Sequence, residues 1–201
     1  MIKKNKYSTW ILVVLAMLFV GPLVAAWSLY TLRAPWLNAT INYGQLVQPP
    51  LNFNQLDLKN SNNTDFDRKN LAGHWVMVYV TPLPCDKTCQ TNLYNMRQVR
   101  TATGKERERI QRLVITFPIN TSATFNKLLN KEYSGTAHAN ISSQTMLAFF
   151  DKNTLKNVTP ENGALYLVDP LGNLMMAYAN NTPPKSLLKD LNRLLKTSQI
   201  G

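Results

Sequence analysis

The sequence predicts an α/β domain behind one N-terminal membrane-spanning helix, and three observations predict it. Residues 10–30 are apolar and carry no charge over the length needed to cross a bilayer core. After them, β-branched and aromatic runs alternate with segments of helical apolar spacing. The chain has 201 residues, so the part beyond such an anchor suits a single domain with a hydrophobic core.

The anchor is expected to make this a single-pass protein of the inner (cytoplasmic) membrane. Its sequence from Trp10 to Tyr30 is WILVVLAMLFVGPLVAAWSLY. Lysines precede it, and because positive charge is retained on the cytoplasmic side, residues 1–9 form a cytoplasmic tail and the C-terminal domain is periplasmic. A cleaved signal peptide ending near Ala25 and Ala26 is the alternative, although its apolar region is usually only about 7–15 residues long.

Residues 31–70 are expected to form a stalk or an irregular entry to the domain. They are rich in Asn, Gln and Pro, as in Gln48-Pro49-Pro50 and in the run Asn60–Asn63. Regularly spaced apolar residues are too few for a long element, and at most a short hairpin is expected. We therefore predict the folded domain over residues 71–201.

The first half of the domain is predicted to contain two buried strands, each followed by a helix. His74–Thr81 (HWVMVYVT) is apolar and rich in β-branched and aromatic residues, as buried strands are. Residues 86–103 have apolar side chains at helical spacing. Arg112–Pro118 (RLVITFP) is a second strand, and residues 121–133 have a helical apolar face. Since parallel strands need a crossover, this half forms a βαβ unit.

The second half is predicted to contain a short helix, a hairpin and a final helix. The short helix covers residues 144–152. Strands Ala164–Asp169 and Asn173–Tyr178 flank a turn sequence with Pro at its second position and Gly at its last. An amphipathic helix follows over residues 183–196. The order strand, helix, strand, helix, hairpin, helix is that of the thioredoxin fold.

The two cysteines of the chain, Cys85 and Cys89, form a Cys-x-x-x-Cys motif between the first strand and its helix. Thiolates at a helix N-terminus are stabilised by the positive end of the helix dipole. If the helix has begun by Asp86, both sulfurs lie on one face. The pair is then suited to hold Cu(I), to exchange with partner disulfides, or to form an inert disulfide. Zinc is disfavoured because no further Cys or His cluster completes a tetrahedral site.

These segments resemble the Sco/SenC family, thioredoxin-fold copper proteins that help to assemble cytochrome c oxidase. The resemblance rests on Gly73–Cys89, on Asn92–Arg100 and on the strand-turn-strand Ala164–Tyr178. It implies Cys85 and Cys89 as the site residues, Cu(I) as the metal, and an oxidase subunit or other assembly factors as partners.

The chain departs from the Sco/SenC pattern in two places. The family usually has Pro after each cysteine, where this chain has Asp86 and Gln90. The family's distal histidine falls on Glu161, and a carboxylate is a poor ligand for Cu(I). The resemblance therefore implies cysteine chemistry more firmly than copper loading.

The remaining soft donors are expected to be structural. His74 opens a strand and is predicted to be a surface residue, whereas His138 is placed in a loop (GTAHAN) from which it can approach the cysteines. The apolar settings of the methionines favour core packing, with Met96 the least certain.

Charge and motifs leave three functions open. The net charge of +11 comes from 22 Lys and Arg against 11 Asp and Glu, scattered in short groups without the interleaved aromatic residues of a nucleic-acid groove. We expect a solvated basic surface and no nucleic-acid partner. The hypotheses are an oxidase assembly factor that delivers Cu(I) or reduces a subunit's cysteines, a general thiol-disulfide oxidoreductase, and a non-catalytic interaction scaffold.

Overall fold

The computed structural model describes residues 6–31, 41–119, 123–150, 155, 158–198 and 200. The chain divides into two compact units, with the boundary between Ile41 and Asn42. The first contains helix α1 (Lys6–Thr31), in which Trp10–Thr31 is long and apolar enough to span a membrane. The apolar side chains of α1 are exposed, as those of a helix that faces lipid would be.

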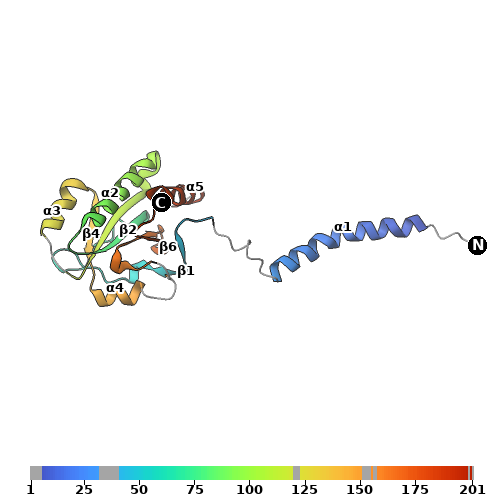
Figure 1. The fold of residues 1–201 in the computed structure, drawn as a ribbon, viewed down its shortest axis with the longest axis horizontal. Helices are drawn as coiled ribbons and strands as arrows, with labels where there is room; N and C mark the ends of the chain where they lie inside the picture. The colour runs from blue at the N-terminus through green and yellow to red at the C-terminus, as the bar shows by residue number, and fades with distance from the viewer. Residues whose placement is uncertain are drawn as a thin grey trace, which may run out of the picture. The chain divides into compact units, whose positions relative to one another are not determined.

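The second unit is built on a six-stranded mixed sheet with the order β1-β6-β5-β2-β3-β4. Figure 1 shows this sheet with β1, β2, β4 and β6 labelled. Strands β2, β3 and β4 are parallel, while β5 joins β2 antiparallel and β1 and β6 continue the antiparallel half. The strands in chain order are β1 (Gln45–Asn52), β2 (Trp75–Pro82), β3 (Ile110–Phe117), β4 (Thr136–Asn140), β5 (Ala164–Val168) and β6 (Asn173–Ala179).

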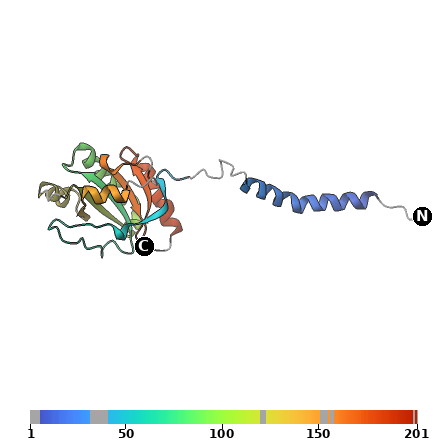
Figure 2. The same cartoon turned by 90° about the horizontal axis from the view of Figure 1, so that it is seen from below.

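Helices cover both faces of this sheet, so it has two hydrophobic cores (Figures 1 and 2). The core on one face is completed by side chains of α2, α3 and α5. The core on the other face is completed by α4 and by the segment that follows β1. The helices are α2 (Lys87–Ala102), α3 (Ala123–Glu132), α4 (Ser143–Phe150) and α5 (Pro184–Thr197). The predicted helices and central strands are therefore present, with ends that differ by a few residues.

The stalk or irregular entry expected over residues 31–70 contains strand β1 from Gln45 onward and packs on the domain from there. Strand β1 pairs antiparallel with β6, and its register shifts between Leu46 and Leu51, where Pro49 and Pro50 lie. Proline lacks an N–H group, so it is tolerated at the edge of a sheet but hides the alternation that identifies a strand. The apolar residues of this segment are buried in the core: Val47, Phe53, Leu56 and Leu58. Residues 32–40 lie outside the described residues.

The loop predicted around His138 is wrong, because residues 136–140 form the edge strand β4. His138 pairs in register with Val114 of β3. Strand β4 is short, and Ala137 and Ala139 give it a weak apolar pattern, so its sequence resembles that of a loop. The expected start of the α3 helix at residues 121–122 and the expected end of the α4 helix at residues 151–152 lie outside the described residues.

Candidate redox site

The two cysteines lie where β2 gives way to α2, at the carboxyl end of the parallel strands. They form a disulfide in which the sulfurs are 1.98 Å apart and the Cα atoms 5.3 Å apart. The preceding loop is tied to β3, because the Leu83 N–H donates to the Phe117 carbonyl over 3.1 Å. The sequence prediction that Cys85 and Cys89 lie together is confirmed.

Asp86 caps the helix that carries Cys89. Its backbone is extended, and its carboxylate accepts a hydrogen bond of 2.8 Å from the Cys89 N–H. Helix α2 therefore begins at Lys87, with Cys85 just before the cap and Cys89 in the first turn. The helix has not begun by Asp86, so the condition for both sulfurs to lie on one helical face is not met, and the two sulfurs meet across the cap residue. Both still lie at the positive end of the helix dipole.

The two cysteines differ in exposure. Cys85 is partly exposed, whereas only 2% of Cys89 is accessible. Cys89 packs in the core formed by α2, with Leu93 and Met96 one and two turns further along the helix. An incoming sulfur therefore reaches Cys85 more readily than Cys89, and access of this kind favours thiol-disulfide exchange at one sulfur of a pair.

A cleft of about 350 Å³ adjoins the disulfide loop on one side. Pro84, Asp86 and Thr88, which surround the cysteines in sequence, line this cleft. Glu161 is another of its lining residues. Glu161 is exposed and belongs to a short 3-10 turn (Pro160–Asn162) that precedes β5. The carboxylate at the position of the family's histidine therefore lines the same cleft as the residues that flank Cys85.

A chain of amide hydrogen bonds holds the walls of this cleft together. The Asn92 side chain donates to the Tyr79 hydroxyl over 3.1 Å and to the Asn180 side-chain oxygen. Asn180 in turn donates to the Asn162 carbonyl over 2.6 Å. Burial raises the pKa of Tyr79, so this hydroxyl stays protonated. Sequence reasoning missed these residues, since isolated Asn residues in an Asn-rich chain carry no signal.

Neither histidine is placed to join the cysteines. His74 is partly exposed just before β2, where its Nδ1 bonds to the Ala72 carbonyl over 3.0 Å. His138 points from β4, two strands away from β2. Its ring nitrogens bond to the Thr116 hydroxyl (2.9 Å) and to the Asn126 side-chain oxygen (2.8 Å). Burial lowers the pKa of His138 to about 4, so the ring is neutral at pH 7.

The donor set at the cysteines does not complete a three-coordinate copper site. The described residues contain no cluster of three or more His, Cys, Asp or Glu side chains with the arrangement of a metal site. Met77, Met96 and Met176 are buried in the core, as expected from their apolar settings. Cys85 and Cys89 supply two soft sulfur donors, and Cu(I) tolerates such a pair but gains from a third soft or nitrogen ligand.

The fold and the cysteine pair together define a thioredoxin-like protein with a Cys-x-x-x-Cys motif. A family model described as the transmembrane-like, thioredoxin-like, C-terminal domain matches residues 75–198. This is more than half of the chain, and the chain belongs to that family. No curated protein sequence matches the chain.

Solved structures of Sco proteins are similar to this one at low sequence identity. Yeast Sco1 with copper bound is 18% identical with a TM-score of 0.54, over 80% of this chain and 96% of that chain. Arabidopsis thaliana ScoI with copper bound is 13% identical with a TM-score of 0.55, over 74% and 98%. BsSco, a member of the Sco family of cytochrome c oxidase assembly proteins, is 15% identical with a TM-score of 0.51, over 80% and 99%. These likenesses show the shared fold.

Proposed function

We propose that the chain is a membrane-anchored, Sco-like assembly factor that keeps the cysteines of a cytochrome c oxidase subunit reduced through Cys85 and Cys89. The asymmetry of the pair carries the proposal, because one disulfide at the start of α2 joins a partly exposed sulfur to a buried one. Similarity to a protein described as a cytochrome c oxidase assembly protein supports the choice of client.

The exchange begins with the reduced pair. The Cys85 thiolate attacks one sulfur of a client disulfide, the client S–S bond breaks, and the departing client thiolate takes a proton. The Cys89 thiolate then attacks the Cys85 sulfur and releases the second client thiolate, which is also protonated. The client gains two electrons, and the pair ends as the Cys85–Cys89 disulfide seen in the structure. An exported dithiol reductant restores the starting thiols.

The anchor places this chemistry on the exported side in our proposal. Helix α1 is the candidate span, and lysines precede its apolar part. The positive-inside tendency retains that end in the cytoplasm and exports the domain to the periplasm. Disulfides form in that compartment, so a client whose metal-binding cysteines must stay reduced needs such a protein there.

Delivery of Cu(I) to the same subunit is the second candidate. Two cysteines that can meet at 5.3 Å between Cα atoms offer two soft donors, and the yeast and Arabidopsis relatives are described with copper bound. Glu161 in the adjoining cleft and the distant His138 argue against the third ligand of the family. Delivery of copper is therefore the second candidate function. The reduction of a client disulfide by Cys85 and Cys89 does not require copper.

The proposal is tested with the full-length chain in lipid nanodiscs. The protein is reduced, freed of copper and mixed without oxygen with a disulfide-bonded peptide from an exported oxidase subunit. We expect stoichiometric peptide reduction, which the double substitution of Cys85→Ser and Cys89→Ser abolishes. Equal rates with an unrelated exported peptide would instead favour a general oxidoreductase. Failure to reduce either peptide, together with transfer of Cu(I) from the loaded protein to the reduced peptide, would favour copper delivery.

A further inference from the structure

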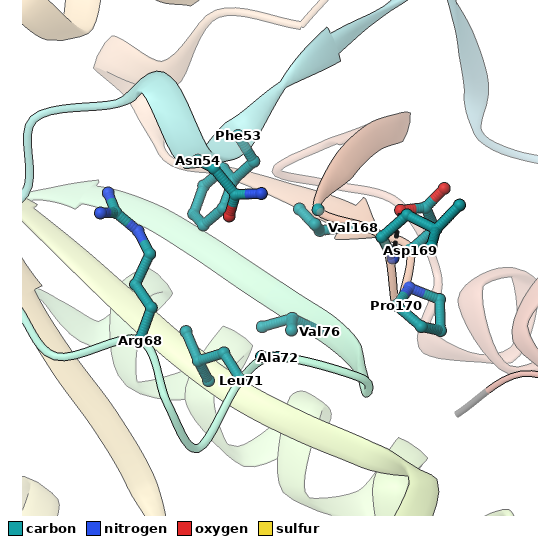
Figure 3. A pocket seen from close by; sticks show the side chains of 11 residues that line it. Phe53, Asn54, Arg68, Leu71, Ala72, Val76, Val168, Asp169 and Pro170 are labelled. Atoms are coloured by element: carbon teal, nitrogen blue, oxygen red, sulfur yellow. Dashed lines mark hydrogen bonds between the residues drawn. The ribbon is translucent and has the colours of Figure 1, made fainter.

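A second cavity lies at the end of the sheet remote from the disulfide, where β2 begins and β5 ends (Figure 3). Its volume is about 100 Å³. Most of the lining is apolar. Phe53 and Leu71 come from the covering segment, which is the stretch between β1 and β2 (residues 53–74), and Val76 and Val168 come from the sheet. It is separate from the site proposed for client reduction.

One side of this cavity is formed by the cation Arg68 (Figure 3). Its Nη2 donates to the Leu56 carbonyl, which ties the guanidinium to the covering segment. Its Nε is buried, and no acceptor among the described residues bonds to it. An arginine keeps its proton in proteins, so Nε–H is a charged donor that requires an acceptor.

The carboxylate that also lines the cavity does not supply that acceptor. Asp169 lies on the side opposite Arg68, with Val168 between them in Figure 3. Its oxygens already accept from the Leu171 N–H, and from the backbone and side chain of Asn173, over 2.7–3.0 Å. The carboxylate therefore stabilises the turn between β5 and β6. Asp57 and Asp65 also interact electrostatically with the Arg68 guanidinium, yet no described acceptor bonds to its Nε.

We propose that this cavity binds a small aliphatic monocarboxylate, whose carboxylate accepts from Arg68 Nε while its short carbon tail packs against Val76 and Val168. A charged donor and a charged acceptor make the stronger class of hydrogen bond. An apolar cavity of about 150 Å³ holds a benzene ring, so about 100 Å³ suits an acid with a tail of only a few carbons. Inorganic anions fit less well, because Asn54 is the one other lining side chain that carries N–H donors.

Butyrate and its uncharged isostere butyramide test this proposal. The full-length protein, with labelled Leu and Val methyl groups in lipid nanodiscs, is titrated with each compound and observed by NMR. We expect saturable shifts at Leu71, Val76 and Val168 with butyrate, and an affinity at least about tenfold lower for butyramide, the loss typical of one charged hydrogen bond. Absence of saturable shifts, or equal affinity for the two compounds, overturns the proposal.

Two variants test separately the charge of Arg68 and the space inside the cavity. Arg68→Gln removes the cation and should lower butyrate affinity at least about tenfold, whereas Arg107→Gln, at an exposed arginine outside the cavity, should leave it unchanged. Ala72→Leu narrows the rim with Arg68 intact and should also abolish binding. The Ala72 variant provides the test if Arg68→Gln does not fold. Undiminished binding in either folded cavity variant, or equal loss in Arg107→Gln, contradicts the proposal.

Discussion

Cys85 and Cys89 lie on either side of a single helix cap, and their surroundings assign them different roles. Cys85 is partly exposed beside a cleft, while Cys89 is buried behind it in the core of α2. The cap residue is Asp86, and its side chain accepts a hydrogen bond from the Cys89 N–H. By the resemblance to the Sco/SenC family, a proline would be expected at this position. In the proposed exchange, Cys85 therefore meets the client and Cys89 resolves the mixed disulfide.

This division of roles predicts what each single serine variant does. With Cys89→Ser, Cys85 should accumulate as a mixed disulfide with a small aromatic disulfide reagent, because the resolving sulfur is missing. With Cys85→Ser, the buried Cys89 should react at least about 100-fold more slowly, since reaction follows thiolate character and access. Mass spectrometry and the released chromophore measure both. Similar rates for the two variants would contradict the assignment.

Glu161 gives a second prediction for a single residue. It lines the cleft beside Cys85, where the family resemblance expects a histidine. The variant Glu161→His should raise Cu(I) affinity at least about tenfold, because imidazole suits copper and carboxylate does not. Competition with a chromophoric Cu(I) chelator measures this, with Glu132→His at the exposed end of α3 as the matched control. No gain over that control would show that position 161 lies outside ligand distance.

At the scale of elements, the start of α2 depends on its cap. Asp86→Ala removes the hydrogen bond to the Cys89 N–H and should lower the free energy of unfolding by about 1 kcal/mol, the usual value of an N-cap. Urea denaturation of the oxidised protein, followed by circular dichroism, measures the change. Lys87→Ala, at the exposed next position, should stay within about 0.5 kcal/mol. Equal effects of the two substitutions would count against the cap.

His138 joins two strands and a helix through the Thr116 hydroxyl of β3 and the Asn126 amide of α3. Burial lowers its pKa from 6.5 to about 4. Between pH 6.5 and pH 4, His138 binds a proton more readily in the unfolded chain than in the folded one. The contribution of neutral His138 to the free energy of unfolding is therefore complete above pH 6.5 and declines as the pH falls toward 4. From pH 7 to pH 5 this residue should account for a loss on the order of 2 kcal/mol.

The His138 contribution is measured as a difference between proteins. Urea denaturation at pH 7 and pH 5 is compared for the wild type and His138→Gln. The free energy of unfolding of the His138 variant should depend less on pH than that of the wild type. A pH dependence that is unchanged in His138→Gln would contradict the buried, neutral imidazole.

Edge strands are the elements that the sequence predicted least well. Strands β1 and β4 lie at the two edges of the sheet, and beyond β4 there is only an isolated bridge between Asn140 and Lys59. Edge strands need less of the apolar pattern by which strands are identified. Proline in β1 and small residues in β4 weakened that pattern further. The central strands β2 and β3 are buried on both faces and were predicted from their continuous apolar runs.

At the scale of the whole molecule, the sequence predicted the fold because its local signals agree with one another. A crossover helix between β2 and β3 requires a parallel pair, and the Asp169–Gly172 turn requires a hairpin. Together they place the cysteine pair at the carboxyl end of the parallel strands. The walls of the adjoining cleft could not be predicted, because Tyr79 and Asn180, which line it and are bridged by Asn92, come together only through the tertiary fold.

A redox titration of the full-length protein determines whether Cys85 and Cys89 can exchange electrons, as the proposed reduction of clients requires. The protein is equilibrated in dithiol buffers of graded potential, its free thiols are alkylated, and the disulfide fraction is measured by mass spectrometry. We expect a reversible two-electron transition at a potential above about −300 mV, the region of exchangeable disulfides. A pair that stays oxidised well below that potential would be an inert structural link, and the proposed exchange with clients would be ruled out.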